Sequence, residues 1–304
     1  MAPRLTPTKC IFYMCILTVS LLFLYSLTLS FHFFNLESVG KCWRVRGPSL
    51  WNKVKPPPNV FMSKDTNVTD DIFNWWKKIQ GSKRNFTYFK ETVTESFKLI
   101  PPVSDAFKPR PGHCRTCAVV GNSGHLIASH FGSLIDSHDA VIRINRGVVK
   151  GYEEDVGSKI THRVLYPESS PRVKNTTKIL FFPYKVRDFD WLRQRFNSED
   201  PRRKLNKDMV TVLHPAFMKY VYDVWLDSRA GYGSTGFMTV ILALAVCDEV
   251  SVFGFGADAD GNWSHYFEKA KYERLGTGLH SGKREYRTLE QLHAEGQLKF
   301  FKKL

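Results

Sequence analysis

The feature that most constrains the fold is an alternation of short β-rich runs with helical runs along the middle of the chain. The β-rich runs occupy residues 117–120, 140–144, 179–182, 210–213 and 249–255, and the helical runs occupy residues 215–226 and 235–245. Alternation of this kind is typical of an α/β domain with a largely parallel central sheet flanked by helices. Ligands of such sheets bind beyond the carboxyl ends of the strands, so the loops at those ends are candidate sites.

Two glycine-containing loops deliver small polar residues to the expected ligand-binding edge. Gly121, Asn122 and Ser123 follow the first strand, Asn145 follows the second, and residues 231–237 (GYGSTGF) lead into a long apolar helix. Backbone N–H groups at a helix start have no partner within the helix. They suit an anionic, nucleotide-like ligand, and the two loops therefore predict one shared site.

The same loops argue against a dinucleotide-dependent dehydrogenase. Its fingerprint is Gly-x-Gly-x-x-Gly after the first strand, with an acidic residue about twenty positions further on. Residues 120–125 read VGNSGH, which lacks that spacing, and Gly254 and Gly256 follow a late strand instead.

The N-terminal region predicts a membrane anchor. Residues 11–31 carry no charge and follow Arg4 and Lys9. A helix of that length just spans a hydrocarbon core of about 30 Å. The alternative is a cleaved signal peptide, but its apolar part is usually about 7–15 residues long and ends in small residues. The preceding positive charges keep the N-terminus cytosolic. We expect a type II protein with a cytosolic tail at 1–10, an uncleaved anchor at 11–31, a proline-containing stem at 32–65 and a folded lumenal domain at 66–304.

Sequons and charge agree with passage through the secretory pathway. Four Asn-x-Ser/Thr sequons follow the anchor, at Asn67, Asn85, Asn175 and Asn262; such sites are N-glycosylation acceptors. The formal net charge is +15, and it is +13 once Arg4 and Lys9 are set aside. A basic lumenal domain suits acidic sugars, sugar nucleotides or anionic membrane surfaces better than nucleic acid.

Four cysteines lie on the lumenal side, at Cys42, Cys114, Cys117 and Cys247. Four cysteines allow three pairings, and disulfides persist in an oxidising lumen. Cys114-x-x-Cys117 could mark a redox or zinc site, but no second Cys-x-x-Cys or His-x-x-x-His pattern completes a set of four ligands. We expect structural disulfides.

Two aspartates form a short pattern with two interpretations. Asp258-Ala-Asp260 is like the Asp-x-Asp motif with which many sugar-nucleotide transferases hold a divalent ion against a diphosphate. The flanking Gly256 and Gly261 equally favour a turn with solvated aspartates.

Two histidines lie in loops rich in Gly and Trp, downstream of the nucleotide-type loop. His265 belongs to the run NWSHY and His280 to the run GTGLH. A neutral imidazole can take a proton from an alcohol, and a second, donating imidazole can stabilise charge on a departing phosphate.

Taken together, four segments resemble the sialylmotifs of the eukaryotic sialyltransferases. Residues 114–147 resemble the large motif, residues 231–256 the small one, His265-Tyr266 the third, and His280 with Glu285 the very small one. They occur in the family's order, and the similarity extends from about residue 75 to the C-terminus. Segments 166–169, 214–220, 247–249 and 254–263 look most like the β-galactoside α-2,3-sialyltransferases that act on Galβ1-3GalNAc.

This resemblance implies a variant of the GT-A glycosyltransferase fold that uses CMP-sialic acid as donor and requires no metal or other cofactor. CMP leaves with a single phosphate and needs less counter-charge than a diphosphate, so Asp258-Ala-Asp260 becomes a turn. The acceptors would be galactose-terminated glycoproteins or glycolipids. The enzyme would be a single-pass type II protein of the Golgi membrane, and the sequence leaves dimerisation open.

The resemblance also implies roles for individual residues. His280 would be the general base, and His265 would contact the leaving phosphate. Donor contacts would come from Asn122, Ser123, Asn145, Tyr166, Ser234, Thr235 and Gly236. Acceptor contacts would come from Gln80, Tyr232 and Trp263. The disulfides would join Cys117 to Cys247 and Cys42 to Cys114, and Glu285 would orient the last loop.

Some residues depart from the family pattern. Gly233 stands where close relatives tend to have proline, and segment 191–208 is shorter and more basic than its counterpart, without an obvious tyrosine for the phosphate. Three alternatives therefore stay open: a sialyltransferase with another galactoside acceptor, a metal-dependent sugar-diphosphate transferase using Asp258 and Asp260, and a weakly active glycan-binding homologue.

Overall fold

A computed structural model describes most of the folded part of the chain. The described residues are 59–102, 113–228, 231–257, 261–268, 276, 278 and 280–302, together with Ser20 and Tyr25. All but four of these, namely Ser20, Tyr25, His113 and Cys114, belong to one compact unit. Within these ranges no helix is both long and apolar enough to cross a bilayer. The anchor predicted at 11–31 lies outside the described residues apart from Ser20 and Tyr25.

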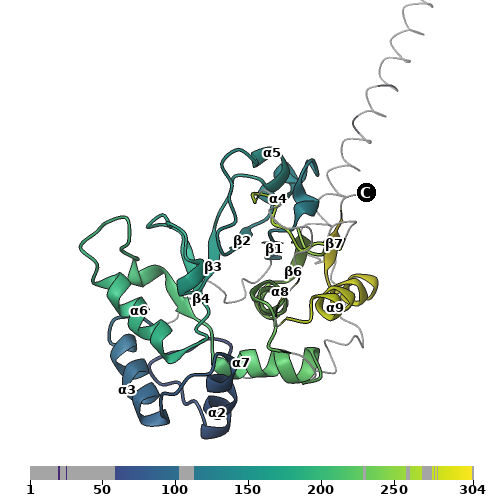
Figure 1. Ribbon diagram of the computed structural model, residues 1–304. Helices are drawn as coiled ribbons and strands as arrows, with labels where there is room; N and C mark the ends of the chain where they lie inside the picture. The colour runs from purple at the N-terminus through teal and green to yellow at the C-terminus, as the bar shows by residue number, and fades with distance from the viewer. Residues whose placement is uncertain are drawn as a thin grey trace, which may run out of the picture. The chain divides into compact units, whose positions relative to one another are not determined.

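A parallel sheet of seven strands forms the centre of the unit, in the order β5-β4-β3-β2-β1-β6-β7 (Figure 1). The strands are β1 (Thr116–Val120), β2 (Ala140–Ile144), β3 (His162–Leu165), β4 (Lys178–Phe181), β5 (Val210–Val212), β6 (Glu249–Phe253) and β7 (Lys299–Phe301). Every neighbouring pair is parallel. The α/β prediction is confirmed, although the sequence pattern missed β3 and β7.

Helices flank the sheet. They are α2 (Asp70–Ile79), α3 (Phe86–Phe97), α4 (Gly132–Asp136), α5 (Glu153–Val156), α6 (Val186–Phe196), α7 (Pro215–Tyr220), α8 (Thr235–Val246) and α9 (Gly282–Ala294). A π-helical turn, Val221–Trp225, continues α7. The predicted helical runs correspond to α7 with this turn and to α8.

Alternate strand residues feed two separate apolar cores, one on each face of the sheet. Cys117 and Val119 of β1 pack in the larger core, which contains the apolar side chains of α8. Ala118 and Val120 pack in the smaller one. Because side chains alternate across a strand, a strand buried on both faces reads as a continuous apolar run. In Figure 1, α4 and α5 lie on the side of β1 and β2 away from α8.

Two contacts define the edges of the folded unit. Met62 is buried, and its N–H donates to the Val212 carbonyl at 2.8 Å, so this segment packs on the end of β5. The structure joins Cys117 to Cys247, the pair that the resemblance implies, which ties β1 to the end of α8. The other implied pair includes Cys42, which lies outside the described residues.

Candidate functional site

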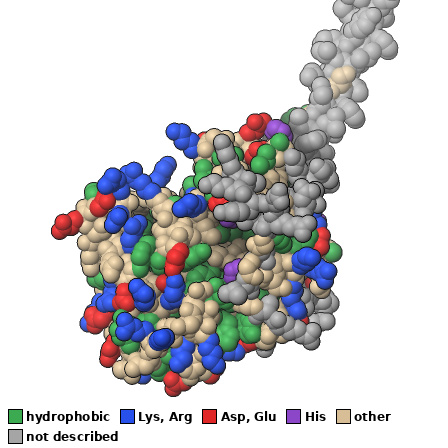
Figure 2. Space-filling view, viewed as in Figure 1, with side chains coloured by type: hydrophobic (Ala, Val, Ile, Leu, Met, Phe, Trp, Pro, Cys, Tyr) green, Lys and Arg blue, Asp and Glu red, His purple; other side chains and the backbone are tan. Residues whose placement is uncertain are grey.

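A cavity of about 340 Å³ lies at the carboxyl ends of the central strands. It collects predicted residues from distant parts of the chain, namely Asn122, Ser123, Asn145, Tyr166, Ser234, Thr235, Gly236, Trp263, His265 and His280. Figure 2, drawn from the same side as Figure 1, shows Lys and Arg side chains over the loops beside β4 and α6. The cavity therefore lies in a domain with a basic surface.

The backbone of the loop after β1 lies in close contact with the backbone at Gly254, just after β6. A Cβ on Gly121 would lie 2.3 Å from the Gly254 carbonyl oxygen, so only glycine fits there. Ser123 Oγ donates to the Gly256 carbonyl at 2.7 Å, and Asn122 Nδ2 donates to the Ile144 carbonyl at 3.2 Å. The bond from Nδ2 aims the other amide atom, Asn122 Oδ1, away from the strand. Among the described residues that buried oxygen has no hydrogen-bond partner.

The loop after β2 presents a second buried amide oxygen. Asn145 has φ +54°, a left-handed conformation that Asn tolerates better than most residues. Its carbonyl accepts a bond of 2.6 Å from Arg163 of β3, and burial lowers the pKa of Arg163 to about 10, which leaves the guanidinium charged at neutral pH. Asn145 Oδ1 is buried and has no partner among the described residues. Two acceptor atoms are thus available for ligand hydroxyl groups.

The start of α8, at Ser234, Thr235 and Gly236, lines the same cavity. Ser234 is the N-cap, and its Oγ accepts from the Phe237 N–H at 3.1 Å. Glu285 of α9 receives the Ser234 N–H at 2.8 Å and its hydroxyl at 2.6 Å. Burial raises the pKa of Glu285 against these bonds. Glu285 therefore holds the start of α8 in place. The role that the resemblance implies for it is to orient the last loop.

His280 lies between two cavities. Its Nδ1 is 2.9 Å from the Tyr232 carbonyl oxygen, so Nδ1 is the donor in that contact. Its ring stands edge-on to Tyr232 at 4.9 Å between centroids. His280 lines both the 340 Å³ cavity and a neighbouring one of about 250 Å³. His280, Tyr166 and Thr235 therefore lie where the two cavities adjoin.

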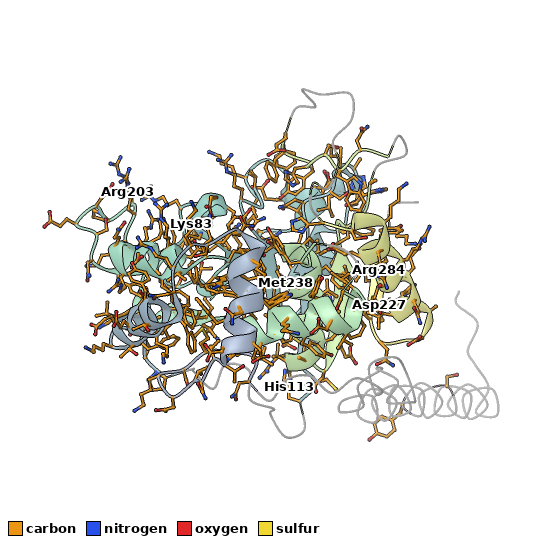
Figure 3. All side chains as sticks on the ribbon, turned by 60° about the horizontal axis from the view of Figure 1, so that its bottom comes forward. Lys83, His113, Arg203, Asp227, Met238 and Arg284 are labelled. Atoms are coloured by element: carbon orange, nitrogen blue, oxygen red, sulfur yellow. A yellow bond between two sulfur atoms is a disulfide. The ribbon has the colours of Figure 1, made fainter. Side chains whose placement is uncertain are left out.

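An ion pair joins α9, the helix that follows His280, to the segment after the π-helical turn. Arg284 in the first turn of α9 binds Asp227, and Figure 3 shows the two side chains next to each other at the edge of the molecule. Asp227 follows the π-helical turn and has φ +49°. The pair ties the α9 start to that turn.

His265 reaches the site through backbone pairing. It forms an isolated antiparallel bridge with Ser123, and the next residue, Tyr266, donates its N–H to the Asn122 carbonyl at 2.9 Å. Its Nδ1 lies 2.9 Å from Glu268 Oε2, and the His265 side chain is 44% exposed.

The second cavity has aromatic walls that sequence reasoning found only in part. It is lined by Gln80, Tyr166, Glu168, Tyr184, Lys185, Tyr232, Thr235 and His280. Tyr184, Lys185 and Glu168 were not among the predicted site residues. Tyr184 and Lys185 lie three and four residues beyond β4, on the connection to α6, so neither stands directly at a strand end.

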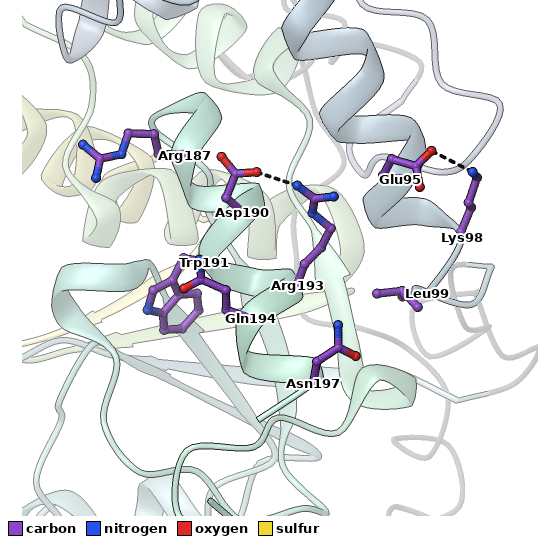
Figure 4. A pocket seen from close by; sticks show the side chains of 9 residues that line it. All are labelled: Glu95, Lys98, Leu99, Arg187, Asp190, Trp191, Arg193, Gln194 and Asn197. Atoms are coloured by element: carbon purple, nitrogen blue, oxygen red, sulfur yellow. Dashed lines mark hydrogen bonds and ion pairs between the residues drawn. The ribbon is translucent and has the colours of Figure 1, made fainter. Parts of the chain in front are cut away.

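A larger hollow between α3 and α6 is a poor candidate for chemistry (Figure 4). Four of its five charged side chains pair with one another, Glu95 with Lys98 at 2.7 Å and Asp190 with Arg193 at 2.6 Å, and the fifth is Arg187. The ring of Trp191 stacks on Phe181 and also lies 5.1 Å from the Arg195 guanidinium. No free aromatic face is left there for a sugar ring.

The remaining predicted residues fall into three groups. Asp258 and Asp260 lie outside the described residues, and those ranges contain no cluster of three His, Cys, Asp or Glu side chains suited to a metal. Three of the sequon asparagines are exposed, at Asn67, Asn85 and Asn175, and Asn262 is half-buried. Gln80 and Tyr232 meet through a side-chain hydrogen bond in the second cavity, while Trp263 lines the first.

The chain is similar to known proteins over both cavities. The sequence model of glycosyltransferase family 29 (sialyltransferase) matches residues 60–297. A Gallus gallus CMP-N-acetylneuraminate-beta-galactosamide-alpha-2,3-sialyltransferase 1 is 39% identical, over 87% of this chain and 82% of the relative. The Sus scrofa protein of that name is 36% identical, over 80% of this chain and 74% of its own length. A crystal structure of a mammalian sialyltransferase in complex with Gal-beta-1-3GalNAc-ortho-nitrophenol matches with TM-score 0.76 and 33% identity, over 87% of this chain and 98% of that one.

Proposed function

This chain belongs to glycosyltransferase family 29, the sialyltransferases, and we propose that it transfers sialic acid from CMP-sialic acid to the 3-hydroxyl of a terminal galactose. Galβ1-3GalNAc on O-glycans or glycolipids is the acceptor we favour, because relatives at this level of identity are named as β-galactosamide α-2,3-enzymes. The observation that carries the proposal is the position of His280 between the two cavities.

The larger cavity is the donor site in this proposal. The ribose hydroxyls of CMP would donate to the buried oxygens of Asn122 and Asn145, which have no partner among the described residues. The phosphate would lie beside the same two residues and Ser123, and the cytidine side would face the start of α8, at Ser234, Thr235 and Gly236, which line the same cavity. His265 would contact the same phosphate from the opposite loop.

The smaller cavity is the acceptor site in this proposal. Gln80 and the hydroxyl of Tyr232, which bind each other, would turn to the galactose hydroxyls. The rings of Tyr166, Tyr184 and Tyr232 give the cavity an apolar wall with polar tips, which suits a sugar ring. Trp263 lies on the donor side, so we propose that it meets the acceptor only where the two cavities join.

The reaction we propose is a direct displacement with inversion. His280 Nε2 takes the proton of the 3-hydroxyl as its oxygen forms a bond to the anomeric carbon of sialic acid. The bond between that carbon and the CMP phosphate oxygen breaks, and CMP leaves as a dianion. The His265 imidazole and donor groups of the loops around the phosphate stabilise the new negative charge. We propose that this needs no metal, because a single phosphate requires less counter-charge than a diphosphate.

We place the enzyme in the Golgi membrane as a type II protein with a lumenal catalytic domain. The uncharged run at 11–31 and the four sequons after it support this placement. Galactose-terminated glycoproteins or glycolipids would then meet the site in the lumen.

One assay tests the proposal. The full chain, purified in detergent, is incubated with CMP-sialic acid and separately with Galβ1-3GalNAc, Galβ1-4GlcNAc and GalNAc, with and without EDTA, and the product linkage is determined. We expect an α-2,3 product chiefly on Galβ1-3GalNAc, unchanged by EDTA. Product on Galβ1-4GlcNAc would move the acceptor class, loss of product in EDTA would favour the metal-dependent reading, and binding of CMP without any product would favour a glycan-binding homologue.

A further inference from the structure

A buried carboxylate behind the acceptor cavity has no part in the chemistry described above. Asp188 lies in the first turn of α6 and is 2% exposed. Its Oδ2 accepts the backbone N–H of Tyr184 at 2.7 Å and that of Lys185 at 3.0 Å. Both donors precede the helix, so one side chain folds the connection between β4 and α6 back against the helix start.

The two residues held by Asp188 form a wall of the acceptor cavity. The Tyr184 hydroxyl lies 2.9 Å from Thr235 Oγ1, and its ring lies 5.3 Å from that of Tyr166 and 5.3 Å from that of Tyr232. The Lys185 ammonium pairs with Glu168 at the outer side of the same cavity. Any shift of the backbone at 184–185 would therefore move an aromatic wall and an ion pair together.

Burial makes the charged form of this carboxylate costly. Burial raises the pKa of Asp188 to about 6, although the two backbone N–H groups and the Lys185 charge act in the opposite direction. A raised pKa means that the charged form is less favourable in the folded protein than in water. A neutral side chain would avoid that cost, so the benefit of the carboxylate has to be sought in the geometry that it imposes.

We propose that Asp188 is a positioning residue for the acceptor: its carboxylate fixes Tyr184 and Lys185 and so sets the width of the acceptor cavity. This inference rests on the proposed function, which assigns that cavity to the galactoside. The donor loops after β1 and β2 take their hydrogen bonds from other strands. Asp188 bonds neither of these loops and reaches the donor cavity only through Tyr184, whose hydroxyl contacts Thr235. We therefore expect its effect to fall chiefly on acceptor binding.

The test separates acceptor from donor. Asp188→Ala removes both hydrogen bonds, and we expect the acceptor KM for Galβ1-3GalNAc to rise about fivefold, the effect of losing a capping interaction. The donor KM and the affinity for CMP should stay within about twofold of the unaltered enzyme. Equal rises in both KM values would indicate general loosening and would overturn the proposal.

Asp190→Ala is the matched control. Asp190 lies two residues further along α6 and faces the hollow of Figure 4, where it binds Arg193 and the hydroxyl of Tyr88. It carries the same charge on the same helix but bonds no residue of the acceptor cavity. We expect its acceptor KM to match that of the unaltered enzyme. If both variants change the acceptor KM equally, Asp188 has no special role.

A second variant decides the matter should Asp188→Ala fail to fold. Asp188→Asn keeps an acceptor oxygen without the charge, and neutral hydrogen bonds are weaker than charge-assisted ones. We expect an acceptor KM between those of the unaltered enzyme and the Ala variant, with no dependence on pH from 7 to 5.

The unaltered enzyme should show an acceptor KM that rises as pH falls, because protonation of Asp188 weakens the same two bonds. The charged groups that act on Asp188 are Lys185, on its own loop, and Glu168, on the turn Pro167–Ser169. An Asn variant with the pH profile of the unaltered enzyme would overturn the proposal.

Binding of Galβ1-3GalNAc measured directly by calorimetry separates the two levels of inference. If the unaltered protein does not bind it, the proposed function fails. If it binds with the same affinity as Asp188→Ala does, the proposed function stands and the role of Asp188 is refuted.

Discussion

The two halves of the site are built in different ways. On the donor side, main-chain bonds set the loops: Gly121 N–H donates to the Phe253 carbonyl at 2.8 Å, and Asn145 N–H to the Val164 carbonyl at 2.8 Å. These are continuations of the parallel sheet beyond its last regular pairs. On the acceptor side, tyrosine rings from three separate segments contact one another, and the wall is made of side chains.

This difference indicates which half of the site single substitutions can alter. Donor loops held by a sheet can move only if the sheet moves, whereas a wall of side chains can be altered by single substitutions. We therefore expect substitutions on the donor side to affect all acceptors alike, and substitutions on the acceptor side to change which galactoside is used.

The largest effect should come from the residue that both halves share. His280→Gln removes the proposed base and keeps a polar side chain, and we expect kcat to fall by about a factor of 10² to 10⁴. Affinity for CMP should be kept, because the donor loops hold their positions without His280. The measurement is turnover on Galβ1-3GalNAc together with CMP binding by calorimetry.

The control for that variant is His130→Gln. His130 is a histidine with a largely exposed side chain that pairs with Glu154 and does not line either cavity. It should keep the turnover of the unaltered enzyme. A His280→Gln enzyme that retains full turnover would remove His280 from the mechanism.

The next largest effect should come from a substitution that weakens donor binding alone. Asn122→Asp replaces a buried amide by a carboxylate of the same shape, next to the proposed phosphate site. Repulsion between the carboxylate and the phosphate, together with loss of the Nδ2 bond to the Ile144 carbonyl, should raise the donor KM about tenfold to a hundredfold. The acceptor KM should change little.

Asn197→Asp is the matched substitution outside the site. Asn197 ends α6 and lines the hollow between α3 and α6. Steady-state kinetics with the donor and acceptor varied separately distinguish the variants. An Asn122→Asp enzyme whose acceptor KM rises as much as its donor KM would show that the two halves are not independent.

How far the sequence alone predicts the site follows the same division. Asn122, Ser123, Asn145 and Ser234 could be predicted because each lies beside a strand end or a helix start that local pattern identifies. Tyr184 and Glu168 could not, because their role depends on contacts between segments that are distant in sequence. The sequence says that a tyrosine follows β4, but it does not say which tyrosines it will face.

The fold shows the same limit. Strands β1, β2, β4, β5 and β6 are apolar enough for the pattern to predict them, whereas β3 reads His-Arg-Val-Leu. Its first two side chains are polar yet buried, at 5% and 6% exposed. Arg163 is buried because it bonds the carbonyls of the loop after β2, a long-range contact that overrides the local preference for a surface position.

A smaller effect should sharpen the acceptor half. Tyr232→Phe removes the hydroxyl that accepts from the Gln80 amide but keeps the ring that packs on Tyr184 and His280. We expect the acceptor KM to rise about fivefold, the size of one hydrogen bond to a sugar, with the donor KM unchanged. Tyr222→Phe is the control, because the Tyr222 hydroxyl bonds the Ser228 carbonyl at 2.9 Å, away from both cavities. Equal kinetics of the two variants would take Tyr232 out of acceptor recognition.

The smallest effect on catalysis should come from the sheet that carries the donor half. Burial lowers the pKa of His162 in β3 to about 3 and that of His214 to about 4, so both are neutral in the folded protein. The unfolded chain binds protons near the usual pKa of about 6.5, and the folded chain does not follow until much lower pH. Stability is therefore lost as pH falls below about 6.5, whereas Asp188, whose pKa is raised to about 6, acts in the opposite direction between about pH 6 and 4.

His162→Phe isolates the contribution of His162 to this pH dependence of stability, because it keeps an aromatic ring in β3 and removes the imidazole. From pH 6.5 to 5 the unaltered protein should lose about 2 kcal/mol at most through His162, and the variant should lose correspondingly less, with a residual slope from His214. Urea unfolding at pH 7, 6 and 5 measures the slope, and His130→Gln should leave it unchanged. Because His162 lies in neither cavity, both KM values at pH 7 should stay as they are; a shift confined to the donor KM would show that the sheet also tunes the donor loops.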